Sequence, residues 1–309
     1  MLLILAHLSI LTCFLFTSFL QVVQHLEELT LDSSDISILS HRVFSANLFS
    51  NIKVLQVHCY HQESAIFPFG FIQKFSNLEK LDVGCCKFRE LFPSEGLVGD
   101  QKKPLGTLSR VRSLKLVLLA NLRHIWKPNS RADLIPPCLE ALVVWDCSKL
   151  VNLAPSSSSF SNLSTLDVWK CHGAEHIIAS STAKSLVQLT KMSIRECNKV
   201  TEIVANEEGE SLTEISFIKL VCLELSRLPS LLYFSSGSYA LKFPSLEDAT
   251  VIQCPSLTNF YIRGELSTPK LHKVWLTEDK DRSCWEGNLN ATSGKMVCFD
   301  SPNPLLVCR

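Results

Sequence analysis

Apolar residues recur with one spacing in three consecutive stretches of the chain, residues 139–147, 163–171 and 189–197. Each stretch reads L-x-x-L-x-L-x-x-C, with Met, Ile or Val replacing some of the leucines. The two central apolar positions are two residues apart, so their side chains share one face of a short strand and the intervening residues face the other way. The apolar spacing then lengthens, which predicts that the chain turns and returns after each strand.

This spelling is the signature of a leucine-rich repeat, in which each coil completes its apolar lining only by stacking on the next coil. It recurs in steps that mostly fall within the usual period of about 20 to 29 residues. The predicted coils open at Leu26, Ile52, Leu78, Val111, Leu139, Leu163, Leu189, Leu220, Leu246 and Leu271. We therefore expect residues 25–277 to form an α/β solenoid of about ten repeats, a leucine-rich repeat horseshoe with a parallel concave β-sheet.

The segments after the strands contain proline and serine rather than a clean helical period, as in residues 228–231 and 254–257. Proline blocks a continuous helix, so the convex side is expected to be mostly irregular, with brief helices at most. Ser-Asn pairs precede the first apolar residue of several coils and predict the turn that leads into each strand. Trp275, near the last strand, is expected to cover the exposed end of the core.

The two ends of the chain fit the repeat less clearly. Residues 1–20 carry no charge and the first Lys or Arg is Arg42, so the basic start of a secretory signal is missing. Three alternatives stay open for residues 1–24: a leader, a membrane span or a degenerate first repeat. The last of these rests on Leu5, Leu8 and Ile10, which match the repeat spelling. Residues 278–309 are expected to form a C-terminal tail.

Charge and cysteine content narrow the function classes. The 30 basic and 30 acidic residues cancel, so we expect no nucleic-acid partner. The 13 cysteines include no C-x-x-C pair, which excludes the common zinc-ribbon and redox spacings. Buried free thiols are expected where cysteine recurs at one repeat position, and they suit a reducing compartment. These cysteines are Cys86, Cys147, Cys171, Cys197 and Cys254.

Catalytic patterns are weak in this sequence. His172 and His176 are four residues apart, but no H-E-x-x-H motif accompanies them. Cys59 is flanked by His58 and His61, but no third group is evident that would orient a nucleophile and base. No G-x-x-x-x-G-K-[ST] phosphate loop occurs. We therefore predict no enzyme, no cofactor and no metal site.

The third, fifth and seventh positions of each coil are expected to point to the concave surface. The seventh positions of three consecutive coils are Trp145, Trp169 and Arg195, and exposed Trp and Arg dominate binding hot spots. The fifth positions add polar residues beside them. The predicted protein-binding set is Trp145, Trp169, Arg195, Lys115, Asp167 and Glu224. The alternative is that the two indoles simply cover each other and stiffen the sheet.

Five phrases resemble the C-terminal leucine-rich repeat region of plant coiled-coil nucleotide-binding leucine-rich repeat (NLR) disease resistance proteins. They are residues 199–204 with the acidic loop that follows, 223–231, 243–247, 267–271 and 285–292. The resemblance implies recognition of a pathogen effector, directly or through a guarded host protein. It also implies contact with a nucleotide-binding domain that the repeats hold inactive. Because the phosphate loop of that family is missing from this sequence, we expect a partial receptor.

The favoured function is thus a non-catalytic protein-recognition module of plant innate immunity, located in the cytoplasm, with no membrane partner. One alternative is a secreted or membrane-associated leucine-rich repeat binding protein, if residues 1–20 act as a leader. Asn162 and Asn290 would then be potential glycosylation sites. Another alternative is a non-functional receptor fragment.

Overall fold

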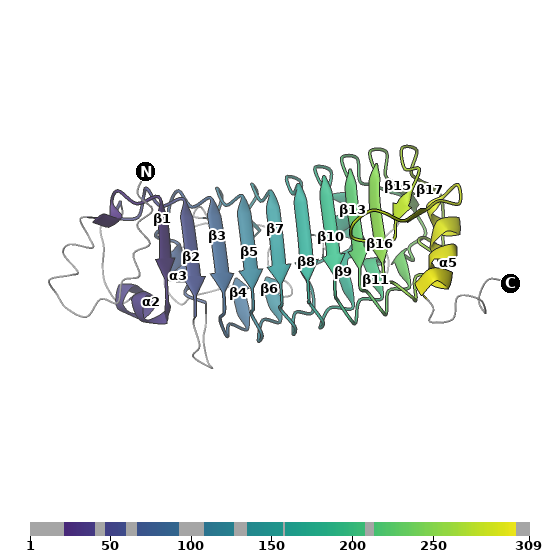
Figure 1. Cartoon of the computed structure of the whole chain (residues 1–309). Coiled ribbons are helices and arrows are strands. Elements are labelled where there is room, and N and C mark those ends of the chain that lie inside the picture. Colours follow the sequence, from purple (N-terminus) through teal and green to yellow (C-terminus); the bar gives the residue numbers. More distant parts are fainter. Residues whose placement is uncertain are drawn as a thin grey trace.

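The computed structural model of this chain describes residues 22–40, 47–59, 67–92, 108–126, 135–156, 158–207 and 213–300. Its main feature is one 11-stranded sheet that runs along the length of the molecule (Figure 1). In spatial order its strands are β1 (Glu28–Leu31), β2 (Val54–His58), β3 (Lys80–Gly84), β5 (Ser113–Val117), β7 (Ala141–Trp145), β8 (Thr165–Trp169), β10 (Lys191–Arg195), β13 (Cys222–Ser226), β16 (Asp248–Ile252), β18 (Val274–Trp275) and β19 (Ser283–Cys284). Only β18 and β19 pair antiparallel within this sheet. The stacked parallel strands confirm the predicted solenoid.

Alternation of side chains along each strand separates the core from the concave surface. In β7, Leu142 and Val144 are buried, whereas Ala141, Val143 and Trp145 are partly exposed. Strands β2, β5 and β8 have the same burial pattern. Nine of the ten predicted coils have a strand that begins two residues after the predicted opening residue, and the last strand begins one residue later. The sequence pattern therefore predicted the register of the concave sheet correctly.

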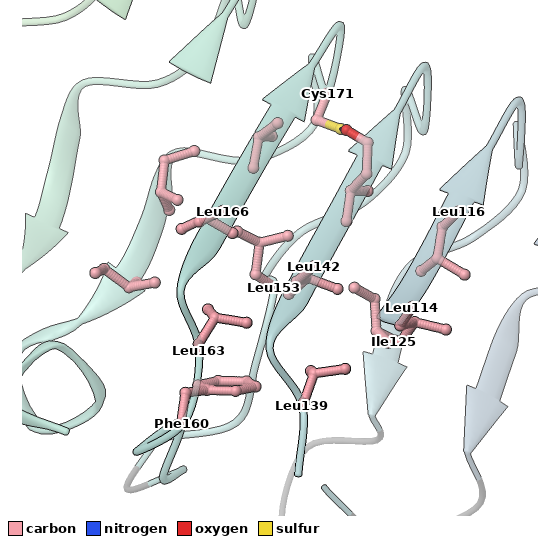
Figure 2. Close-up of a cluster of buried hydrophobic side chains, with 14 of the residues drawn as sticks. Leu114, Leu116, Ile125, Leu139, Leu142, Leu153, Phe160, Leu163, Leu166 and Cys171 are labelled. Atoms are coloured by element: carbon pink, nitrogen blue, oxygen red, sulfur yellow. The ribbon is translucent and has the colours of Figure 1, made fainter. Parts of the chain in front are cut away.

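The buried faces of all the coils form one continuous hydrophobic core, which includes residues from Val23 to Leu289. Leu114, Leu142 and Leu166 occupy equivalent places on adjacent strands, and each is buried (Figure 2). Burying such a leucine fully contributes roughly 1.5 to 3 kcal/mol. Because each leucine is covered by the neighbouring coils, this stabilisation depends on stacking and is not available to one coil alone.

The concave strands from β2 to β16 are each followed directly by a residue with left-handed backbone conformation. At this eighth repeat position φ is 53° for Asp146, 54° for Lys170 and 53° for Glu196. The N–H of Asp146 donates to the carbonyl oxygen of Trp169 in the next coil at 2.7 Å. The turn therefore extends the hydrogen-bond ladder by one step and returns the following side chain to the core.

In five coils that following side chain is the predicted buried cysteine. Cys86, Cys147, Cys171, Cys197 and Cys254 are all buried and free, which confirms the prediction. The Cys171 thiol donates to the carbonyl oxygen of Val144 at 3.6 Å. A hydrogen bond with Cys147, together with burial, raises the pKa of Cys171, and burial raises the pKa of Cys197 to about 12. These thiols are therefore packing groups and not nucleophiles.

The turns that lead into the strands are fixed by asparagine. Asn51, Asn77 and Asn162 lie in turns, as their Ser-Asn pairs predicted. Their side-chain amides donate to main-chain carbonyl oxygens of the preceding coil, at 2.5 Å to Gln24, 2.7 Å to Ser50 and 2.8 Å to Pro137. Each amide thus satisfies a turn carbonyl and joins two coils.

The convex side contains short strands that the sequence pattern did not predict. They form three small parallel sheets: β4 (Glu90–Phe92) with β6 (His124–Trp126); β9 (His176–Ala179), β11 (Glu202–Ala205) and β14 (Tyr233–Ser235); and β12 (Glu214–Ser216), β15 (Ala240–Lys242) and β17 (Leu266–Ser267). Helices are brief except at the ends: α2 (Ser33–Ser40), α3 (Phe69–Ile72), α4 (Ser180–Lys184) and α5 (Leu289–Asp300). The expectation of brief convex helices between turns is confirmed for α3 and α4.

Trp275 does not cover the end of the core, so this prediction is wrong. Trp275 is paired with Thr250 across β16 and β18 and lies on the partly exposed side of the sheet, because it falls between the buried Val274 and the inward Leu276. The end of the core is covered instead by Trp285 and the buried Leu289 of α5. The Asn290 side chain accepts from the N–H of Tyr261 and donates to its carbonyl oxygen, both at 2.7 Å. The segment predicted as a tail thus contains β19 and the docked helix α5.

The start of the chain remains a matter of prediction. Residues 1–21 lie outside the described residues, so the leader, membrane-span and degenerate-repeat alternatives are all retained. The first described residues form a short helical turn before β1. Within the described ranges, no helix combines the length and the apolar content that crossing a bilayer requires.

Candidate functional site

Trp145 and Trp169 lie side by side on the concave sheet. They end β7 and β8 and are paired in register, and their ring centroids are 6.1 Å apart with an interplanar angle of 88°. Both side chains are partly exposed, whereas their strand neighbours Val144 and Val168 are buried. The two indoles therefore make an edge-to-face pair on the surface and are not part of the hydrophobic core.

A lysine ammonium group lies over each of the two indole rings. The Nζ atom of Lys115, on β5, lies 4.9 Å from the centroid of the Trp145 ring. The Nζ atom of Lys170 lies 4.4 Å from the centroid of the Trp169 ring. Both distances fall within the range of favourable cation–π contacts. The Trp145 Nε1 atom is shielded from solvent and has no hydrogen-bond partner.

Glu196 connects the Trp169 side of the pair to the next coils. The Trp169 indole N–H donates to the Glu196 carboxylate, and Lys170 Nζ lies 3.8 Å from it. Arg227 Nη1 contacts the same carboxylate at 2.9 Å. Burial raises the pKa of Glu196, but the hydrogen bonds from Trp169 and Arg227 and the nearby positive charges outweigh it, so the net pKa is lowered.

Arg195 and Asp167 form the polar part of the same surface. Arg195 follows Trp169 in the seventh-position column, and its Nη2 atom contacts both carboxylate oxygens of Asp167, at 3.0 and 3.3 Å. On the next strand, Glu224 accepts a hydrogen bond from Ser193 at 2.7 Å. These contacts hold the charged side chains in defined positions, so a partner would meet a preformed surface.

The six predicted residues therefore lie together on five neighbouring strands of the sheet: β5, β7, β8, β10 and β13. Trp169, Arg195 and Glu224 also line a cavity of about 480 Å³ on the concave side. This arrangement consists of aromatic, cationic and anionic groups in a row, with no nucleophile and base in contact. We name this group of side chains the tryptophan patch: Trp145, Trp169, Arg195, Lys115, Asp167 and Glu224.

The repeats of this chain match a known protein family. The model of plant disease resistance protein RPS2-like leucine-rich repeats matches residues 25–159 and 153–278, which together are most of the chain. The chain belongs to this family. None of the curated proteins compared with the chain matches it. A solved leucine-rich repeat protein of Leptospira interrogans is 12% identical over 84% of this chain and 86% of its own, but its TM-score of 0.25 is too low to support any argument.

No enzymatic family is indicated by the family match. His172 follows β8, whereas His176 lies in the convex strand β9. His58 ends β2, Cys59 begins the turn after it, and His61 lies outside the described residues. Among the parts of the chain that the structure covers, no group of three His, Cys, Asp or Glu residues could hold a metal ion.

Sequence reasoning missed one column of charged side chains beside the tryptophan patch. The eighth position, which has the left-handed backbone, places Lys170, Glu196 and Arg227 in one ion-paired row beside the tryptophan patch. A signal was present, because these three charged residues follow the strands of consecutive coils. It was overlooked because only strand positions were assigned to the surface.

Proposed function

We propose that this chain is a protein-recognition module of plant innate immunity whose concave face binds a partner through the tryptophan patch. The partner is a pathogen effector or a guarded host protein, as the resemblance to resistance receptors implies. The observation that carries the proposal is the surface pair of Trp145 and Trp169, with a lysine over each ring.

Physical reasoning supports a binding role for this pair. Large aromatic groups and arginine give the greatest losses of binding free energy when interface residues are truncated, commonly about 2 kcal/mol or more. The indoles are already ordered by each other and by the lysines, so little additional side-chain entropy is lost on binding. The unpartnered Trp145 N–H adds a donor that a small rotation of the ring would offer to a carbonyl group.

The alternative that the pair only stiffens the sheet predicts a different outcome. Cross-strand aromatic pairs contribute about 0.2 to 1 kcal/mol to a sheet. In that case truncation of the two tryptophans would lower the free energy of unfolding without affecting the binding of any partner. The two interpretations therefore separate on binding, because only the recognition role predicts that a partner is lost.

Location inside the cell is part of the proposal. Five buried free thiols suit a reducing compartment. Both asparagines of the potential glycosylation sites use their side-chain amides within the fold, Asn162 to Pro137 and Asn290 to Tyr261. A glycan on either nitrogen would alter these hydrogen bonds, which weighs against the secreted alternative. A nucleotide-binding domain is proposed as a second partner, in keeping with the family, and no catalytic role is proposed.

The experiment compares three baits expressed in leaf tissue: the wild type, a W145A/W169A variant and a matched L232A/I262A variant. Leu232 and Ile262 are exposed apolar residues outside the concave strands. We expect a partner that wild type and the matched variant retain and that W145A/W169A loses at least about tenfold, as hot-spot truncation implies. Quantitative mass spectrometry of the co-purified proteins measures this. If all three baits retain the same proteins in equal amounts, the proposal is wrong.

A further inference from the structure

The loop between β18 and β19 folds back across the C-terminal part of the concave face. Its two ends are joined by the N–H of Leu276, which donates to the Arg282 carbonyl oxygen at 3.0 Å. Figure 1 shows this loop in front of β16, extending towards β13. We call residues 277–282 the strap.

The strap is held to the sheet by two ion pairs. Glu278 Oε1 lies 2.7 Å from Arg227 Nη2, and Lys280 Nζ is paired with an oxygen of Asp248. Arg227 follows β13 and Asp248 begins β16, so the strap contacts both strands through charges of opposite sign. The acidic Glu278 and the basic Lys280 of the strap therefore each pair with a group of opposite charge on the concave face.

The surface beneath the strap is covered, unlike the surface of β7 and β8. Ser226, Thr250 and Ile252 are only 2%, 8% and 9% exposed, although their repeat positions point to the concave side. The corresponding side chains of β7 and β8 are partly exposed. The covered residues and Cys222 line the same cavity of about 480 Å³ as Glu278 and Lys280 of the strap. The tryptophan patch meets this cavity at Trp169 and Arg195.

The strap is attached only weakly to the concave face. Residues 278–282 are all exposed, so no apolar burial fastens them. Exposed ion pairs shift an equilibrium by about fivefold or less each, and salt screens them further. A closed strap and an open strap therefore differ little in free energy, and a modest competing interaction is enough to exchange them.

From these observations we propose that the strap is an internal ligand of the concave face. It occupies a docking site that fits a peptide turn carrying an acidic and a basic side chain two residues apart, as in Glu278 and Lys280. A partner segment with this charge pattern displaces the strap and uncovers the polar cavity beside the tryptophan patch. The proposal extends the proposed function, because the same face is involved, but it can be tested without any partner.

Cys222 provides a built-in reporter of strap opening. Its thiol is partly exposed and lines the cavity beneath the strap. Alkylation by iodoacetamide is followed at Cys222 by mass spectrometry, with the partly exposed Cys138, which does not line this cavity, as internal reference. The full chain is compared with an E278Q/K280Q variant. The matched control is E247Q/K270Q, which removes another exposed ion pair by the same substitutions.

We expect Cys222 to react at least about threefold faster in E278Q/K280Q than in the wild type, and to be unchanged in E247Q/K270Q. Electrostatics alone would act in the opposite direction. Burial raises the pKa of Cys222 and the positive charge of Lys280 offsets part of this rise, so loss of Lys280 raises the pKa further and slows the thiolate reaction. Faster alkylation therefore reports uncovering. An unchanged Cys222 rate, or an equal gain in the control variant, overturns the proposal.

The second arm tests the docking site itself. A capped synthetic peptide of residues 276–283 is added at millimolar concentration to E278Q/K280Q, since a tethered loop competes at an effective concentration of this order, about millimolar. We expect it to slow Cys222 alkylation by about half or more, and a peptide with Lys at 278 and Glu at 280 to have no effect. If neither peptide protects Cys222, or both protect it equally, the strap is only a cover and the assigned docking chemistry is wrong. Neither result depends on whether the tryptophan patch has a partner.

Discussion

The contribution of the tryptophan pair to folding can be separated from its contribution to binding by a double-mutant cycle. The perturbation is Trp145→Ala, Trp169→Ala and the two together, in the full chain. Both rings lie outside the hydrophobic core, so their removal leaves a gap on the surface and not a cavity. The loss of stability should therefore be smaller than for a core leucine.

The magnitude follows from the contacts that each ring makes. An edge-to-face pair at this separation is worth about 0.5 to 1.5 kcal/mol beyond area burial, and this is the expected coupling energy of the cycle. Each lysine over a ring adds about 0.5 to 1 kcal/mol at an exposed site. We therefore expect the double variant to lose about 1.5 to 3.5 kcal/mol in the free energy of unfolding. Truncation of the buried Leu166 to Ala should cost about 2 to 5 kcal/mol.

Urea denaturation followed by circular dichroism measures these differences, with L166A as the core reference. A coupling energy near zero would show that the two rings do not contact each other in solution. A loss in W145A/W169A larger than in L166A would place the rings in the core, and the surface interpretation of the patch would then fail.

Three further predictions follow from the packing between coils. An alanine Cβ at Gly173 would come within 2.7 Å of the Leu150 carbonyl oxygen, whereas at Gly84 its close contacts would be with the movable His58 ring. G173A should therefore lower the free energy of unfolding by about 1 to 3 kcal/mol and G84A by clearly less, as measured by thermal unfolding. In the native protein, DTNB should label the exposed Cys59 within minutes and leave Cys86, Cys147, Cys171, Cys197 and Cys254 unreacted until urea is added; rapid native labelling of the five would refute the buried ladder. N290A should lower the free energy of unfolding by about 1 to 3 kcal/mol, because the buried main chain of Tyr261 loses both hydrogen-bond partners. N198A, on the rim of the concave side, serves as the control. Equal losses in the two variants would show that α5 is not docked through the Asn290 side chain.

The concave sheet was predictable because its information is local. Inward and outward side chains alternate within five residues, so Leu142 and Val144 identify the strand that presents Trp145. The same rule would have placed Trp275 correctly. It lies between Val274 and Leu276, which both face inward, and only the general need for an end cap suggested otherwise.

The convex strands were not predictable from alternation. Ile177 with Ile178, and Ile203 with Val204, are adjacent residues that are both buried, and these strands are too short to show a period. The strap was also hidden, because the contact between Lys280 and Asp248 joins residues far apart in the chain. Such ion pairs between distant charges leave no spacing that a sequence pattern could show.

The central claim, that the surface around Trp145 and Trp169 contacts a protein partner, is tested most directly by hydroxyl-radical footprinting of the chain with and without the partner retained in the bait experiment. Tryptophan oxidises readily where solvent reaches it, so each ring reports on its own exposure. The account predicts that oxidation of Trp145 and Trp169 falls several-fold in the complex, while that of Trp285, at the C-terminal end of the core, is unchanged. Equal oxidation of Trp145 and Trp169 in the free and bound chain would contradict it.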